Sequence, residues 1–327
     1  MVEIAFVIPL LPLLSFVLIT FWGRHLPGKG SLVAIAAIGW GLVHSLCLFS
    51  QMLLTENWAP EDVPLYDFFK LSENGAPIIE IAYRLDGLST VMLVVVTLVS
   101  TLVHVYSLGY MGYNTPEEDS RFSRFFAALS LFSFSMLVLV MANNFAVVFI
   151  AWELVGFCSY LLIGHWFEKD YPDPNQITPR QAAVKAFLTT KVGDLGFVIG
   201  LIGLFALCAM AKPDMPTFNF DDVFKTIRTG VISGTIPMWA LTAVGLCIFF
   251  GAVGKSAQFP LHTWLPDAME GPTPVSALIH AATMVAAGVY LVGRIFPLLT
   301  PDAGLIIAYV GGFTALFAAS IALVRND

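Results

Sequence analysis

The chain has 327 residues, of which 57% are hydrophobic and 12% are charged, and its formal net charge is −7. A typical soluble domain is about 45–50% apolar and about 25% charged, so this composition excludes an ordinary soluble enzyme and a disordered chain. The acidic balance offers no basic surface for phosphate, and we expect no nucleic-acid partner. The sequence therefore predicts a polytopic membrane protein surrounded by the lipid bilayer.

A helix that crosses the bilayer needs about 20 apolar residues, and such runs recur along the whole chain. The N-terminus turns apolar at once, without a basic segment or a cleavage site, so we expect the first helix to be retained rather than removed as a signal peptide. A short helix at the membrane surface is also predicted, over residues 260–269. The predicted spans are 3–22, 31–54, 86–109, 122–142, 144–164, 181–211, 236–256, 272–297 and 302–324.

The segments between the spans differ in character. Residues 55–85 form a long acidic loop that contains Glu73, and residues 77–84 alternate weakly, as in a short surface hairpin. Residues 165–180 and 212–235 are predicted to be polar loops. Lys and Arg favour the cytoplasmic side, and a slight excess of them predicts that the N-terminus lies outside. The inner side collects Arg24, Lys29, Arg121, Arg124, Lys169, Arg180, Lys185 and Arg325, and the outer side Lys70, Arg84, Lys212, Lys225, Arg228 and Arg294.

The cysteines give no sign of a metal or redox site. Cys47, Cys158, Cys208 and Cys247 are scattered singly in apolar stretches, without a Cys-x-x-Cys pair or a Cys/His cluster. An iron–sulfur cluster or a structural zinc therefore has no ligand set. No Gly-x-Gly-x-x-Gly motif follows a strand pattern, so a nucleotide site has no support either. We expect no metal and no bound cofactor in this chain.

Four ionisable residues fall inside the predicted spans: Glu153, Lys191, Asp194 and Lys255. Such a group at mid-membrane costs about 2.5–3.5 kcal/mol on insertion scales and marks a functional site by default. Lys191 and Asp194 lie three residues apart on one helix and are predicted to pair. Lys255 stands where glycines and a proline predict a discontinuous helix near 251–262, which would admit water. A contact between Glu153 and Lys255 that forms and breaks would switch Lys255 between holding and releasing a proton.

His280, inside the next predicted span, can pass protons near neutral pH. Each of these residues also has a purely structural interpretation. Glu153 and Lys255 could form a static buried ion pair that fixes helix packing, and Lys191 and Asp194 could form a second structural pair. His280 could be a core histidine whose hydrogen bonds are satisfied.

Several motifs together point to one family. Residues 254–291, which begin Gly254-Lys-Ser-Ala-Gln258, form the longest of them. The resemblance is to the large antiporter-like membrane subunits of respiratory complex I, and best to chain L (chain 5) of NADH–quinone oxidoreductase. It runs from the first helix to the last residue. The other matching motifs are Asn144–Gly156, Lys191-Val-Gly-Asp194, Leu85-Asp-Gly-Leu88 and Ser107-Leu-Gly-Tyr-Met111.

The resemblance implies a role for each buried charge. Glu153, Lys255 and His280 would form the first half of a proton path across the membrane, and Asp194 would support the lysine. The family often has Arg at position 191; Lys keeps the charge but not the two-pronged guanidinium. The resemblance also implies an all-α, antiporter-like transmembrane bundle. NADH, FMN, iron–sulfur clusters and quinone would bind to partner subunits. The partners of this chain would be other membrane subunits of complex I, especially neighbouring antiporter-like subunits.

Family members continue into a second repeat with its own broken helix and lysine, whereas this sequence stops at Asp327. The resemblance thus predicts three leading helices in 1–121, a first five-helix repeat in 122–297, and the first helix of a truncated second repeat in 298–327. We expect a translocase subunit of NADH:quinone oxidoreductase that takes part in proton translocation. Two alternatives stay open: the large subunit of a cation/proton antiporter, and a truncated remnant that moves no ions.

Overall fold

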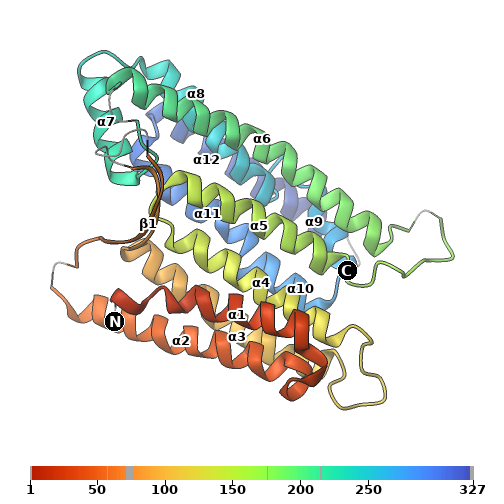
Figure 1. Ribbon diagram of the computed structural model, residues 1–327. Coiled ribbons are helices and arrows are strands. Elements are labelled where there is room, and N and C mark those ends of the chain that lie inside the picture. The colour runs from red at the N-terminus through yellow and green to blue at the C-terminus, as the bar shows by residue number, and fades with distance from the viewer. Residues whose placement is uncertain (1, 57, 71–76, 175, 214–215, 325–327) are drawn as a thin grey trace.

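The protein is an all-helical membrane bundle with one small β-hairpin, seen in a computed structural model that describes residues 2–56, 58–70, 77–174, 176–213 and 216–324 (Figure 1). Within these ranges, nine helical segments are long and apolar enough to cross a membrane, as the sequence predicts. Glu73, Arg325 and Asp327 lie outside the described residues. The spanning helices are α1 (Val7–Trp22), α2 (Ser31–Leu54), α3 (Gly87–Tyr110), α4 (Phe122–Met141), α5 (Phe145–Ile163), α6 (Pro179–Ala211), α8 (Met238–Lys255), α10 with α11 (Thr273–Ala277 and Met284–Ile295) and α12 (Pro301–Ala322).

Polar residues start several of these helices where the sequence turns apolar. Asp86 accepts a hydrogen bond from the backbone N–H of Ser89 and caps α3, and the Asn144 side chain accepts from Val147 and caps α5. Thr178 begins α6 in the same way. Capping satisfies the first backbone N–H groups, which have no partner within the helix.

Helix α4 is the centre of the bundle and its most buried span. It packs against α1, α3 and α5, while α6 packs against α5 on one side and α8 on the other. The leading helices α1, α2 and α3 form a group along the lower side of Figure 1, and α6 and α8 lie towards the opposite side (Figure 1). Helix α12 packs on α8, and none of its most apolar stretch is buried within the chain.

Two elements occupy segments that the sequence assigns to loops. The predicted hairpin exists and is larger than expected: β1 (Glu61–Lys70) pairs antiparallel with β2 (Pro77–Leu85). The polar segment 212–235 contains a helix, α7 (Phe220–Ile232), so the prediction of a plain loop there is wrong. Its buried residues Phe220, Val223, Ile227 and Gly230 recur every three or four positions, which is the spacing of an amphipathic helix face.

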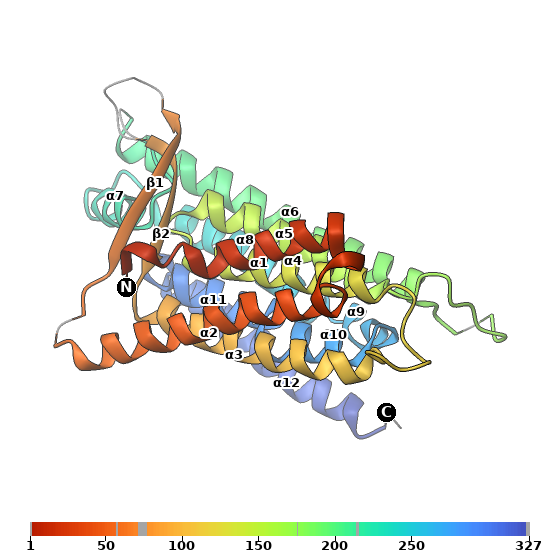
Figure 2. The same ribbon diagram turned by 60° about the horizontal axis from the view of Figure 1, so that its bottom comes forward.

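The hairpin and α7 cover one end of the bundle (Figure 2). The backbone of Phe218, just before α7, donates to Ile78 of β2, and the Phe220 ring packs edge-on against Phe145 at the start of α5. The Tyr83 hydroxyl donates to the carbonyl of Val2, 2.9 Å away, so the hairpin also holds the N-terminal segment. These contacts close the end of the bundle at which the chain begins.

A network of charges fastens this end. Arg84 of β2 contacts Asp62, Asp86 and Asp221 at 3.0–3.3 Å, joining both strands, the start of α3 and α7. Arg294, near the end of α11, makes an ion pair with the same Asp86. Both guanidinium groups are largely buried. Because a buried charge is costly without a partner, the network fixes where these elements can sit.

We predict that Asp86→Asn destabilises the fold in a pH-dependent way. Burial raises the pKa of Asp86, but the hydrogen bond and charge of Arg294, with the Ser89 N–H, outweigh it and lower that pKa from 3.8 to about 2. A carboxylate with a lowered pKa in the folded state stabilises it above its unfolded pKa, and this contribution is lost as pH falls towards the folded pKa. The substitution should lower the free energy of unfolding by about 2.5 kcal/mol near neutral pH.

The measurement is thermal unfolding of the detergent-solubilised chain as a function of pH. The gap in Tm between Asp86→Asn and the parent should narrow below about pH 4, the unfolded pKa. Glu117→Gln, an exposed loop carboxylate, is the control and should leave Tm unchanged. A gap of constant size down to about pH 3, inside the window between the two pKa values, would contradict the assignment.

Candidate functional site

Helix α8 ends at Lys255, inside the apolar bundle, and the chain does not return to helix until Trp264. The predicted break near 251–262 is therefore confirmed. Ala257 takes a positive φ of 51°, and the backbone N–H of Gln258 bonds to the Val253 carbonyl at 2.9 Å, which turns the chain away from the helix axis. The Trp264 indole donates to the Gly254 carbonyl at 3.0 Å, so an orphan carbonyl of the helix end gains a partner.

The Lys255 side chain is fully buried at this break. Its Nζ lies 3.8 Å from the Asp194 carboxylate and 5.8 Å from the centre of the Trp152 ring. A β-carbon built on Gly156 would stand 2.2 Å from Nζ, so a larger residue there would force the ammonium to shift. Among the described residues, Nζ has no hydrogen-bond acceptor.

Asp194 is the link between Lys255 and the other charges. Its carboxylate accepts a hydrogen bond from the Trp152 indole at 2.6 Å and lies 3.3 Å from Lys191 Nζ, as the i, i+3 spacing predicts. Lys191 in turn makes a close ion pair with Glu153. The four residues thus form a line of alternating sign, Glu153–Lys191–Asp194–Lys255, which we call the charge line.

The predicted direct contact of Glu153 with Lys255 is not the pairing observed. In the part of the chain that the structure describes, Glu153 pairs with Lys191, and Lys255 has Asp194 as its carboxylate. The reason is the position of α6, which packs between α5 and α8 and carries both middle charges. The sequence identifies all four residues but not their order, because order depends on which helices touch.

Small residues let α6 and α8 come close enough for this contact. A β-carbon on Gly193 would lie 2.9 Å from the α-carbon of Gly254, and further along the helices Gly196 faces Phe250. Any larger residue at Gly193 would separate the two backbones. Close approach through small residues is the usual packing of membrane helices, which gain little from the hydrophobic effect within lipid.

His280 stands on a second interruption, which the sequence reading misses. The predicted span 272–297 is α10, a π-helical segment (Leu278–Ala282), and α11. The Thr283 hydroxyl donates to the Leu278 carbonyl at 2.5 Å, taking up a carbonyl that the wider turn leaves exposed. Such π-segments are frequent at functional sites. The Pro, Ser and Thr residues of 272–283 are the feature of the sequence that could have predicted this interruption.

The two nitrogens of the His280 ring are buried, and neither has a hydrogen-bond partner among the described residues. The ring lies 6.2 Å from that of Trp264, which itself bonds to Gly254 beside Lys255. His280 therefore lies beside the break in α8 rather than in a satisfied core position. Buried polar groups without protein partners are the places where internal water binds.

Across the described residues, no group of three or more His, Cys, Asp or Glu side chains is placed to hold a metal ion. The four cysteines are free thiols, with Cys158 and Cys208 buried. What the arrangement can do is hold charge: two carboxylates and two ammonium groups in line, ending beside an imidazole at two helix breaks.

Comparison with known proteins places this chain in a family. Residues 142–327 match the family described as NADH:quinone oxidoreductase/Mrp antiporter, and residues 74–126 match the complex I chain 5 N-terminus. Subunit L of the F420H2 dehydrogenase of Methanosarcina mazei is 44% identical over 339 residues, which cover 99% of this chain and 47% of the relative. Subunit L of the NADH-quinone oxidoreductase of Rhodobacter capsulatus is 44% identical over 329 residues, 98% of this chain and 43% of the relative.

Solved structures agree on the fold. The Mrp complex from Dietzia sp. DQ12-45-1b contains a chain that is 27% identical, with a TM-score of 0.72, over 99% of this chain and 31% of that one. A chain of an archaeal membrane-bound sulfane sulfur reductase also gives a TM-score of 0.72, at 19% identity. The match covers 95% of this chain and 46% of that one. The chain spans about half the length of the curated relatives it matches. It is an integral, multi-pass membrane protein and belongs to the antiporter-like family of NADH:quinone oxidoreductase and Mrp membrane subunits.

Proposed function

We propose that this chain takes part in proton translocation as the L-type membrane subunit of a proton-pumping NADH:quinone oxidoreductase. The observation that carries the proposal is a fully buried lysine at a helix break, joined by Asp194 and Lys191 to Glu153. Relatives named as subunit L of such an oxidoreductase match nearly the whole chain. NADH, FMN, iron–sulfur clusters and quinone would bind to other subunits of the complex.

The charge line gives the proposal a physical mechanism. Lys191 lies between two carboxylates and can favour either one. While Lys191 pairs with Glu153, Asp194 is available to stabilise the Lys255 ammonium. If Lys191 moves fully to Asp194, that carboxylate is neutralised and the buried ammonium loses its partner, which favours release of its proton. Charge interactions of this kind are stronger inside an apolar bundle than in water.

His280 is the proposed next station. Its ring nitrogens are buried without partners in the described part of the chain, and the ring lies beside Trp264, next to the turn that follows Lys255. Water bound between the two breaks would connect ammonium and imidazole, and an imidazole exchanges protons near neutral pH. Glu153, Lys255 and His280 are therefore the proposed proton carriers, and Lys191 and Asp194 the charges that control them.

The wider arrangement extends the proposal. Residues 1–121 would form the leading unit, 122–297 a first half-channel and 298–327 the start of a second repeat. The end with Arg24 and Lys29 would face the cytoplasm, with the N-terminus outside. Membership of multi-subunit membrane complexes among the relatives supports a membrane partner, and we propose a neighbouring antiporter-like subunit.

A cation/proton antiporter subunit is the second candidate, because the matching chain of the Mrp complex is 27% identical across almost all of this chain. The two proposals share the charge line and differ in the driving reaction. Proton movement that follows electron transfer and ignores a sodium gradient supports the oxidoreductase. Proton movement that follows an imposed sodium gradient, without electron transfer, supports the antiporter.

We predict that Lys255→Ala, made in the assembled complex, reduces proton translocation to background, because the substitution removes the buried ammonium at the break. The measurement is acidification of inverted membrane vesicles, followed by a pH-sensitive dye, with circular dichroism to confirm that the helices persist. Glu153→Gln should remove most of the coupled activity. Lys225→Ala, an exposed lysine of α7, is the control and should pump normally. Normal pumping by Lys255→Ala would refute the proposed function.

A double-mutant cycle tests whether Asp194 is the counter-ion of Lys255. Asp194→Asn keeps an oxygen for the Trp152 indole but leaves a buried ammonium unpaired, which should cost about 3–5 kcal/mol. Lys255→Met leaves Asp194 paired with Lys191, so its effect should be small. The double variant should recover most of the stability that Asp194→Asn loses. Stability is measured for each variant by thermal unfolding in detergent. Additive effects of the two substitutions would contradict the pairing.

A further inference from the structure

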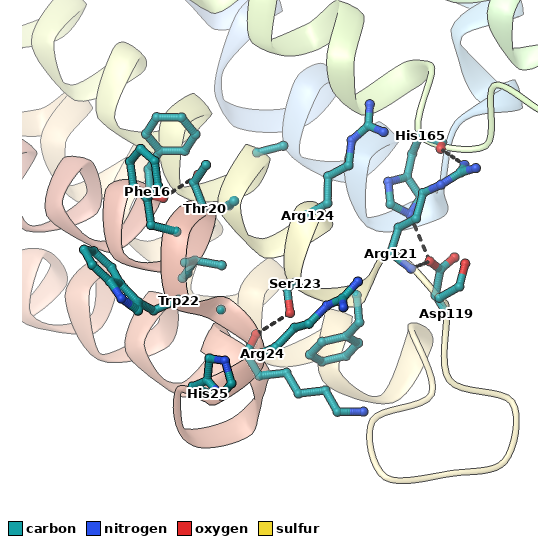
Figure 3. A pocket seen from close by; sticks show the side chains of 18 of the residues that line it. Phe16, Thr20, Trp22, Arg24, His25, Asp119, Arg121, Ser123, Arg124 and His165 are labelled. Atoms are coloured by element: carbon teal, nitrogen blue, oxygen red, sulfur yellow. Dashed lines mark hydrogen bonds and ion pairs between the residues drawn. The ribbon is translucent and has the colours of Figure 1, made fainter.

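A large polar cleft lies far from the charge line, at the end of the bundle opposite the hairpin. It has a volume of about 910 Å³ and lies between the end of α1 with the turn η2 (Gly23–His25), the start of α4, and the residues after α5 (Figure 3). The Ser123 hydroxyl of α4 donates to the Lys29 carbonyl at 2.9 Å, which joins two of its walls. A pocket of about 300–1,000 Å³ can hold a small-molecule ligand or a headgroup of similar size.

The lining of this cleft is strongly basic. Four of its residues are permanently cationic: Arg24, Lys29, Arg121 and Arg124. Lys29 makes an ion pair with Glu118, and Arg121 pairs with Glu168 at 2.5 Å. The remaining lining carboxylate, Asp119, accepts from the Trp166 indole at 2.8 Å and lies 3.4 Å from His165.

Two guanidinium groups of the cleft have no ion-pair partner among the described residues. Among the described residues, neither Arg24 nor Arg124 has a carboxylate partner, and both are exposed on opposite walls of the cleft (Figure 3). Burial lowers the pKa of His165, and the charges of Arg124 and Arg121 add to this effect against the opposing Asp119. His165 is therefore neutral at pH 7 and does not add to the charge. Four cations stand against the three carboxylates Glu118, Asp119 and Glu168, so one positive charge is left uncompensated.

The neighbouring surface shows where an anion would come from. Phe21 and Trp22, at the end of α1, line the cleft and expose 72% and 54% of their surface. The same helix exposes Leu18 and Leu14, which lie about one and two turns before Trp22 along α1. Aromatic side chains at this level mark the membrane interface, and the aliphatic strip below them is a lipid-facing surface. A molecule with a negative head and apolar chains matches both parts.

We propose that the cleft between α1 and α4 binds an anionic phospholipid, whose phosphate lies between Arg24 and Arg124 and whose acyl chains follow the exposed face of α1. Guanidinium groups bind phosphate oxygens through charge-assisted hydrogen bonds and are the preferred phosphate ligands among side chains. A basic pocket between membrane helices is an established form of anionic headgroup site. The bound lipid would supply the missing charge and hold the end of α1 against α4.

The test measures which lipid stays with the protein. The full chain is reconstituted into phosphatidylcholine vesicles that contain a minor fraction of phosphatidylglycerol, extracted in mild detergent, and the retained lipids are quantified by mass spectrometry. Phosphatidylglycerol should be enriched over its share in the vesicles. Arg24→Gln combined with Arg124→Gln should lower that enrichment by about 25-fold, because each cation near an anionic surface contributes roughly a factor of five.

The matched control is Lys225→Gln combined with Arg228→Gln, which removes two exposed cations from α7 at the other end of the molecule. It should retain phosphatidylglycerol like the parent, and Arg24→Lys with Arg124→Lys should retain most of it. Helix content and Tm confirm that each variant is folded. Equal enrichment in the parent and the Gln pair, or equal loss in the control, overturns the proposal. Displacement of the lipid by inorganic phosphate at matched concentration would assign the cleft to free phosphate instead.

Discussion

The buried ammonium of Lys255 is the constraint on which the centre of the structure depends. A charged group in an apolar bundle is costly unless a counter-ion and room are provided. Asp194 provides the counter-ion and Gly156 the room. Asp194 reaches Lys255 only because Gly193 and Gly254 let α6 and α8 approach closely. One side chain thereby explains a glycine on α5, a glycine contact between α6 and α8, and the end of α8.

Hydrogen bonds and an ion pair fix the chain after α8 and both ends of α11. Arg294 anchors the end of α11 to Asp86, and the Ser256 hydroxyl bonds to the Val285 carbonyl at 2.7 Å at its beginning. Helix α12 holds the unwound chain after Lys255, because Thr314 accepts a hydrogen bond from the Phe259 N–H at 3.0 Å. Between these anchors lies the π-segment with His280, whose buried ring nitrogens have no hydrogen-bond partner within the described chain.

Much of this could be predicted from the sequence, and the failures have physical causes. The spans follow from apolar runs of bilayer length, and helix α2 begins and ends at the predicted residues. The four charges within the spans stand out because few charges interrupt such runs. Helix α7 was missed because an amphipathic surface helix is mixed in polarity and lacks an apolar run. The pairing of Glu153 with Lys191 was missed because contacts between helices are not encoded in the periodicity of any one helix.

The contrast between α6 and its neighbours explains how such a site can work. Helix α6 runs unbroken over 33 residues and carries Lys191 and Asp194 on one rigid rod. The helices that carry Lys255 and His280 are interrupted at those residues. A continuous helix keeps its hydrogen bonds satisfied and is costly to bend, whereas an interrupted one can shift by small changes at the break. In the proposed mechanism, a pair of opposite charges on a continuous helix stands beside two groups on interrupted helices, so that a small displacement at a break would change which group has a counter-ion.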